Sequence, residues 1–103
     1  MKRTELFDYV LQAVANETEV DASFIVSNKR ASEIVDSRMI LVMLLYDIGF
    51  GSGYIANKLH RTEKGIKYLA EMAIWRLRQN KLFRRSYEEI KKQIASNESI
   101  AGI

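Results

Sequence analysis

Few side chains of this sequence have the type and spacing that an enzyme active site requires. His60 is the single imidazole, and no serine or threonine stands at a spacing that makes it a nucleophile activated by that base. Glu88 and Glu89 form the only adjacent pair of carboxylates, but neighbouring positions on a helix do not face each other. We therefore expect no catalytic site and a protein that is not an enzyme.

Cofactor and metal sites are equally poorly represented. Gly49, Gly51 and Gly53 alternate, but a phosphate-binding loop needs a preceding strand and a different glycine spacing. A helix is expected before these glycines, which favours a turn between helices. The chain has no cysteine and one histidine, which excludes a thiolate zinc site and a His-rich metal centre. We expect no cofactor and no bound metal.

The most informative constellation of residues runs from Asp47 to Ile66. It reads as the end of a helix, a glycine turn, a short helix, a polar turn and the start of a longer basic helix. This order is typical of a helix-turn-helix, whose second helix presents its N-terminal side chains and free amide groups to the major groove of DNA. Apolar residues are expected to fill the space between its two helices: Ile55, Leu59, Ile66 and Leu69, with the small Ala56 at the crossing. An ordinary helical hairpin is the alternative.

Basic and aromatic side chains supply the candidate DNA contacts. Lys64 and Lys67 are expected to meet bases or phosphates, and Tyr68 is expected to meet a phosphate or a sugar. An arginine pair, Arg84 and Arg85, is expected just before a helix N-terminus, where it could hold a phosphate. The candidate DNA-binding residues are Arg38, Arg61, Thr62, Lys64, Lys67, Tyr68, Arg78, Arg84 and Arg85. Plain solvent exposure is the alternative for the charged members.

Apolar periodicity predicts helices in the first half of the chain and no strand. A helix is expected over Thr4–Asn16 with Thr4 as its N-cap, followed by a polar segment in which Asp21 caps a short apolar turn. The residues Ala31–Ile48 form the longest apolar helix and have little polar face, so we expect it to be central and buried. Gly49 is expected to end this helix in the left-handed conformation, with Phe50 closing over its last turn.

The second half of the sequence predicts three more helices. A short one covers residues 52–59, and a long one begins after the N-cap Thr62 and runs to about Lys81. The apolar face of the long helix holds Ile66, Leu69, Ala70, Ala73 and Leu77, and Trp75 is expected to pack against the last helix. Ser86 and Glu89 have the spacing of a capping box, which predicts that the last helix begins at Ser86.

We therefore expect an all-α fold of five to six helices, a helix-turn-helix domain around a central buried helix. A chain of 103 residues has the length of one domain. Residues 1–30 are assigned to the N-terminal helix and the polar segment that links it to the central helix, and residues 31–81 to the central helix and the helix-turn-helix. Residues 82–96 hold the C-terminal helix, and residues 97–103 form a frayed tail.

Charge is unevenly distributed along the chain. The segment from Lys58 to Lys92 holds eleven basic and four acidic residues, while the rest of the chain carries net negative charge. A basic segment in an otherwise acidic chain indicates a polyanion partner, and double-stranded DNA is the one we expect; a solvated charged surface is the alternative.

Nothing in the sequence predicts a membrane span or a secretion signal. The longest apolar run, Met39–Tyr46, is eight residues long, and a span needs about 20. Glu5 and Asp8 interrupt the apolar start of the chain, which argues against a signal peptide. We expect a soluble cytoplasmic protein that does not associate with membranes.

Several residues of the helix-turn-helix region also resemble a known family, the C-terminal DNA-binding domain of the bacterial replication initiator DnaA, which is Trp-repressor-like. The likeness covers residues 28–95 and is carried by Ser37-Arg38 before an apolar helix, Tyr54-Ile55-Ala56, Leu59, Arg61 and Ile66. It implies an all-helical fold, with Arg38 reaching DNA outside the major groove and Arg61 at the signature arginine. The family's base-reading positions hold Thr62, Glu63, Lys64 and Gly65 here. The stretch Arg61–Tyr68 is likewise similar to LuxR-type domains.

The sequence thus predicts a non-catalytic protein that binds duplex DNA through a helix-turn-helix, as a regulator or accessory factor of transcription or replication. The alternative is a helical protein–protein interaction adaptor that uses exposed Tyr54, Tyr68 and Trp75. A homodimer or a partner protein is compatible with either function.

Overall fold

Six helices and no strand occur within residues 2–97, the part of the chain that the computed structural model describes. The helices are α1 (Arg3–Thr18), α2 (Ala22–Ile25), α3 (Ser32–Ile48), α4 (Ser52–Leu59), α5 (Glu63–Gln79) and α6 (Lys81–Ala95). The predicted all-α class is confirmed. Of the tail predicted for residues 97–103, all but Asn97 lies outside the described residues.

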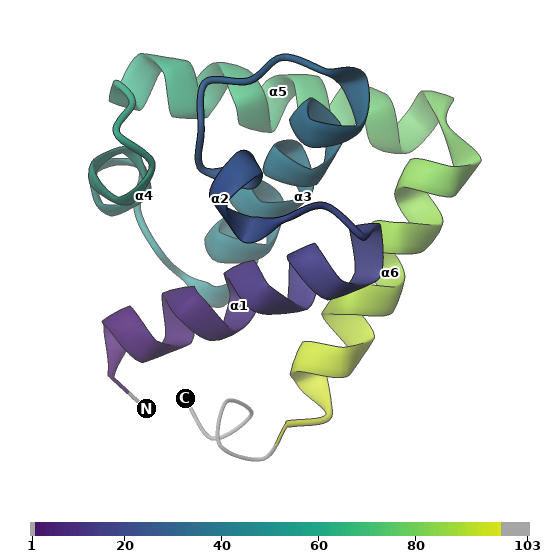
Figure 1. The fold of residues 1–103 in the computed structure, drawn as a ribbon, viewed down its shortest axis with the longest axis horizontal. Coiled ribbons are helices and arrows are strands. Elements are labelled where there is room, and N and C mark those ends of the chain that lie inside the picture. Colours follow the sequence, from purple (N-terminus) through teal and green to yellow (C-terminus); the bar gives the residue numbers. More distant parts are fainter. Residues whose placement is uncertain (1, 98–103) are drawn as a thin grey trace.

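The helix α3 is the one on which the others pack. It contacts each of the other five helices, and in Figure 1 it lies between α1 below and α5 above. Its apolar second half is buried almost all round, with Ile40, Leu41, Val42, Leu44 and Leu45 shielded from solvent. The prediction of a central buried helix is therefore confirmed.

A left-handed glycine ends α3 and turns the chain toward α4. Gly49 has φ 115°, a conformation that glycine adopts without steric cost. The amide of Phe50 donates to the carbonyl of Leu45 at 3.0 Å, and the Phe50 ring is buried. This hydrogen bond and the buried ring together close the end of the helix as the sequence predicts.

The helix α5 is fixed across α3 by its apolar face and by one ion pair. Ile66 and Ala73 are fully buried, while Leu69, Ala70 and Leu77 pack against the core with part of their surface exposed. The Arg76 guanidinium donates from Nε and Nη2 to the two carboxylate oxygens of Asp36 on α3, at 3.1 and 2.9 Å. A two-point contact of this kind fixes orientation as well as distance.

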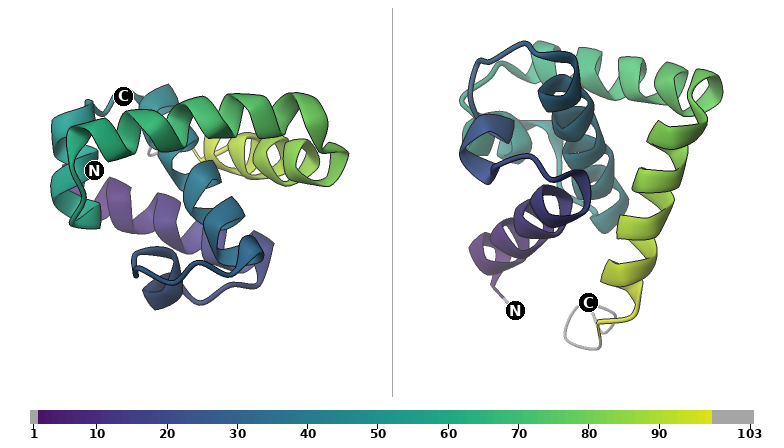
Figure 2. Two further views of the ribbon diagram at one scale, coloured as in Figure 1. Left: turned by 90° about the horizontal axis from the view of Figure 1, so that it is seen from above. Right: turned by 45° about the vertical axis from the view of Figure 1, so that its right-hand side comes forward.

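The last helix begins earlier than the capping box predicts. Asn80 is the N-cap of α6, and its side chain accepts from the amide of Phe83 at 2.8 Å. The same residue ends α5, because its own amide donates to the carbonyl of Arg76. Ser86 lies inside α6, so the predicted start there is wrong, and the long helix ends at Gln79 rather than Lys81. Figure 2 shows α6 leaving the end of α5 and running back along the side of the molecule.

The ends of the first two helices test two further predicted caps. The first helix starts at Arg3, and the amide of Leu6 donates to the carbonyl of Lys2, so Thr4 lies within the first turn and is not the N-cap. Asp21 does cap α2, accepting from the amide of Ser23 at 2.9 Å. None of the helices within residues 2–97 has the length and hydrophobicity to cross a membrane.

Candidate nucleic-acid interface

The helices α4 and α5 are joined by the turn His60–Arg61–Thr62, which is the order of short helix, polar turn and longer helix that the sequence predicts. His60 ends α4 in the left-handed conformation with φ 53°, and the amide of Arg61 donates to the carbonyl of Ala56 at 2.9 Å. The chain therefore turns from α4 into the steeply crossed α5 within three residues, as Figure 1 shows. His60 is thus the C-cap of α4.

Three of the four apolar side chains predicted to fill the space between the two helices are buried, and the fourth, Leu69, keeps part of its surface exposed. Ile55, Leu59 and Ile66 are fully or almost fully buried, and the small Ala56 is buried beside them. Because these side chains belong to the same core as α3, the two helices are held rigidly against the central helix. A surface carried by this unit is therefore preorganised.

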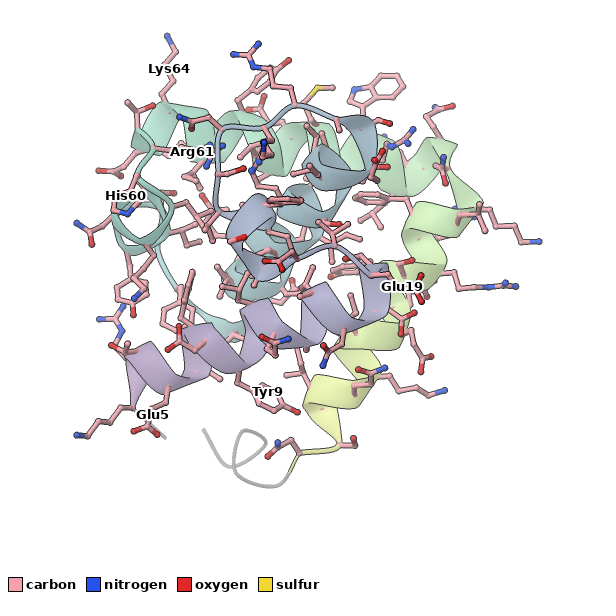
Figure 3. All side chains as sticks on the ribbon, viewed as in Figure 1. Glu5, Tyr9, Glu19, His60, Arg61 and Lys64 are labelled. Atoms are coloured by element: carbon pink, nitrogen blue, oxygen red, sulfur yellow. The ribbon has the colours of Figure 1, made fainter. Side chains whose placement is uncertain are left out.

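The beginning of α5 presents a basic face to solvent. Thr62 accepts from the amide of Gly65 at 3.0 Å and so acts as the predicted N-cap. Lys64, Lys67 and Tyr68 are exposed, with Tyr68 at 60%, and Figure 3 shows Lys64 extending away from the rest of the molecule. The first two turns of α5 thus offer the side chains that a reading helix uses.

The one carboxylate at the start of α5 is turned toward α4. A Cβ placed on Gly53 would lie 3.7 Å from the carboxyl group of Glu63. Gly53 belongs to the first turn of α4, where the helix dipole favours negative charge. The Glu63 carboxylate therefore stabilises the start of α4.

Arg38 does not extend from the surface as the family resemblance implies, and this is a correction. Its side chain is 3% exposed and folds against the connector, which we define as residues 26–31 between α2 and α3. Its Nε donates to the carbonyl of Ile25 at 2.7 Å, and its Nη2 donates to the carbonyls of Phe24, Ser27 and Lys29. A resemblance at the level of sequence could not show that this guanidinium is occupied by backbone carbonyls.

Arg61 is half-buried and reaches the same connector. Its Nη1 donates to the carbonyl of Leu59 at 3.2 Å, and its Nη2 donates to the carbonyl of Ser27 at 2.8 Å. Burial lowers the pKa of Arg61, and burial together with the charge of Arg61 lowers the pKa of Arg38. Both groups nevertheless stay charged at neutral pH, because arginine is not deprotonated in proteins.

A groove opens between the connector and the start of α5, and we call it the arginine groove. Its polar lining consists of Asn28, Arg30, Arg38, Arg61, Thr62 and Tyr68, over a floor that includes Val35 and Leu69. Asn28 and Arg30 are absent from the sequence-based set. The signal that could have found them is the basic pair Lys29-Arg30 directly before the central helix.

The remaining predicted arginines lie at the other end of α5. Arg78 is exposed in its last turn, whereas Arg84 and Arg85 lie inside α6. Arg84 donates from Nη1 to the carbonyl of Leu77 at 2.9 Å. The prediction that this pair precedes a helix N-terminus is wrong, because Asn80 starts α6 before it. A helix of 17 residues spans about 25 Å, so these arginines are remote from Lys64.

An exposed apolar stripe runs along the outer side of α5. Tyr68, Met72 and Trp75 follow one another at helical spacing, and Trp75 is 62% exposed. The prediction that Trp75 packs on the last helix is wrong, because Trp75 lies on the solvent-exposed side of α5, whereas α6 packs with the core through Phe83. Tyr54, by contrast, is half-buried: its ring stacks on Phe50 with centroids 4.8 Å apart, and the Arg3 guanidinium lies 4.3 Å over it.

Within residues 2–97 no three His, Asp or Glu side chains converge in a way that could hold a metal ion. Comparison of the chain with models of known protein families, with curated proteins and with solved structures finds no match.

Proposed function

We propose that this chain binds double-stranded DNA without catalysis, through the helix-turn-helix formed by α4 and α5, as a regulator or accessory factor of transcription or replication. The observation that supports it best is the exposed set Lys64, Lys67 and Tyr68 on the first two turns of α5. These side chains stand beside the helix N-terminus, where free amide groups and the helix dipole favour phosphate.

The surroundings of this face support the same function. α4 braces α5 through buried contacts, and Glu63 is directed to the first turn of α4. Lysine and tyrosine at these positions reach both phosphate oxygens and base edges when a helix end enters the major groove. With three to four phosphates contacted, the slope of log affinity against log salt is expected to be roughly −3 to −4, at about 0.9 per phosphate.

The test is a fluorescence-anisotropy titration of random duplex DNA at several salt concentrations. The double variant Lys64→Ala/Lys67→Ala should lose most of the affinity and make the salt slope shallower by about one to two. A matched control, Lys81→Ala/Lys92→Ala, removes the same charge from exposed positions of α6. This control should retain most of the affinity for duplex DNA. Equal losses in the two variants would show that net charge, not this face, binds DNA.

A protein-interaction adaptor is the second candidate, and the exposed stripe of Tyr68, Met72 and Trp75 favours it. Aromatic and methionine side chains are enriched where proteins bind one another. Trp75 is about three turns beyond Lys64 in α5, so Trp75→Ala should leave duplex affinity nearly unchanged under the DNA proposal. If wild type binds no duplex at low salt, the adaptor becomes the better interpretation.

A further inference from the structure

Two guanidinium groups converge on a single backbone oxygen in the arginine groove. The Nη2 atoms of Arg38 and Arg61 each donate to the carbonyl of Ser27, both at 2.8 Å. The two ion pairs found among residues 2–97 join Arg76 to Asp36 and Lys91 to Asp47, so neither of the converging arginines has a carboxylate partner there. Carbonyl dipoles hold these cations in place but leave their net charge uncompensated.

Both guanidinium groups keep donors that no protein acceptor uses. Arg38 hydrogen-bonds through Nε and Nη2, and no acceptor within residues 2–97 takes its Nη1. No buried side-chain nitrogen of the described chain is left without a partner, so this Nη1 must retain contact with solvent. Because the surrounding residues bury all but 3% of Arg38, and Arg38 lines the arginine groove, that opening is the groove itself.

The same groove carries a third cation and neutral donors. Arg30 is exposed at the end of the connector and lines the groove, as do Asn28 and Tyr68, whose side chains carry an amide and a hydroxyl. None of the described residues that line it is acidic, and the N-terminal turn of α5 borders it at Thr62 and Gly65. Cations, hydrogen-bond donors and a helix N-terminus thus meet in one concave place, which is the combination that oxyanions require.

We propose that the arginine groove binds one phosphate group, held by the guanidinium groups of Arg30, Arg38 and Arg61. Planar guanidinium donors match phosphate oxygens, and an incoming dianion or phosphodiester relieves the repulsion between neighbouring cations. Resting on the proposed function, the phosphate is one of the DNA backbone beside the reading helix α5. A free phosphate is the other source of the same chemistry, and the experiments below separate the two.

The first experiment follows the full-length chain by NMR during titration with inorganic phosphate, with sodium chloride at equal ionic strength as reference. The Nε–Hε signals of Arg38 and Arg61 and the amide of Gly65 should shift saturably with phosphate only. Arg30→Gln should weaken this binding about three- to fivefold, the size expected for one exposed charge contact. Arg85→Gln, an equally exposed arginine on α6, should not change it.

The second experiment measures duplex binding by the same two variants, after thermal unfolding has shown that both fold as wild type does. If the phosphate belongs to DNA, Arg30→Gln weakens all duplexes alike and makes the salt slope shallower by about one, while Arg85→Gln leaves both unchanged. Saturable phosphate binding with unchanged DNA binding by Arg30→Gln would assign the groove to a free phosphate.

The two proposals fail in different ways. If the protein binds phosphate saturably but binds no duplex, the phosphate-binding proposal stands and the proposed DNA function is wrong. If phosphate and chloride shift the NMR signals equally, and Arg30→Gln does not alter the salt slope of duplex binding, the phosphate-binding proposal is wrong. The proposed DNA function is then unaffected.

Discussion

Among single residues, Arg38 has the widest structural role. One guanidinium donates to the carbonyls of four residues, Phe24, Ile25, Ser27 and Lys29, which surround a segment without regular secondary structure. Carbonyls shielded from solvent need partners. Arg38 supplies one to each of these four, and Arg61 donates a second hydrogen bond to the carbonyl of Ser27. The path of the chain from α2 to α3, and with it one wall of the arginine groove, therefore depends on Arg38.

Arg38→Met is expected to destabilise the fold by about 2–4 kcal/mol, because the carbonyls of Ile25 and Lys29 lose the donors that Arg38 supplies. Relief of the repulsion between Arg38 and Arg61 offsets part of this loss. Urea unfolding measures the change, with Arg84→Met as a control that removes an exposed arginine and one backbone hydrogen bond. A loss below about 1 kcal/mol would mean that the connector does not need this guanidinium.

Glu19 shows a local strain that is independent of the candidate site. It follows α1 in the left-handed conformation with φ 58°, which costs a residue with a side chain about 1–2 kcal/mol. Glu19→Gly should therefore stabilise the protein by about 0.5 kcal/mol, after the greater entropy of glycine in the unfolded chain is taken into account. The midpoint temperature of thermal unfolding should therefore rise by about 2–4 °C.

The control for this prediction is Gln12→Gly, at an exposed position inside α1. It should lower stability by about 1 kcal/mol, because glycine is a poor helix former. If both glycines destabilise to the same extent, the left-handed conformation of Glu19 carries no strain.

Local signals explain which residues the sequence could predict. Asp21, Gly49 and Thr62 act within a few residues of themselves, so their roles follow from residue type and spacing. Arg38 binds carbonyls 9 to 14 residues away, and the exposure of Trp75 depends on which side of α5 the other helices cover. Neither fact depends on neighbouring residues, and both needed the tertiary structure.

At the scale of helices, Asn80 decides how α5 and α6 meet. Its extended backbone ends one helix, and its side chain caps the next with no intervening loop. The S-x-x-E pattern at Ser86 predicted a later start because the same residue types also occur inside an amphipathic helix, where Ser86 and Glu89 lie. A capping motif is therefore informative only where the preceding residues cannot be helical.

Two alanine variants separate these alternatives. Asn80→Ala should destabilise the protein by about 1 kcal/mol through loss of the cap. Ser86→Ala should change it by less than about 0.5 kcal/mol, because that position is inside the helix and alanine is a good helix former. Urea unfolding of both proteins measures the difference, and the reverse order of losses would place the start of the helix at Ser86.

The bounds of the helix pair α4 and α5 could be predicted closely. Its short helix matches the expected residues 52–59, since glycines bound it on one side and a left-handed His60 on the other. The arginine groove could not be predicted, because it joins the connector to α5 across more than 30 residues of sequence, as the bond from Arg61 to Ser27 shows. Long-range convergence of this kind leaves no periodic trace in the chain.

Over the whole molecule, the core built on α3 links the candidate interface to stability. Leu41 is fully buried and belongs to the one hydrophobic cluster that joins the helices. Leu41→Ala should cost about 2–5 kcal/mol, which is much of the stability of a domain of this size. Urea unfolding checks this, and an unchanged midpoint would contradict the assignment of the core.

The arrangement of the helices also predicts which end of the molecule DNA covers. Lys64 and the arginine groove lie at the N-terminal end of α5, and Arg85 lies beyond its C-terminal end. These ends are about 25 Å apart, whereas the major groove is about 12 Å wide. One groove crossing centred on the first turns of α5 therefore does not extend to Arg85.

Lys64→Ala should lower affinity for a selected duplex by about 1–3 kcal/mol and flatten the preference among sequences, as loss of a base contact does. Arg85→Ala should leave both affinity and preference unchanged, although it removes the same charge. Selection from a random duplex library, followed by anisotropy titration of the selected and a scrambled site, measures both effects.

Both variants must first melt as wild type does, so that lost binding is not lost fold. A selected duplex that Lys64→Ala binds as tightly as wild type would mean that α5 does not read bases through its first turn. Equal losses for Lys64→Ala and Arg85→Ala would mean that DNA follows the whole length of α5 rather than meeting its N-terminal end.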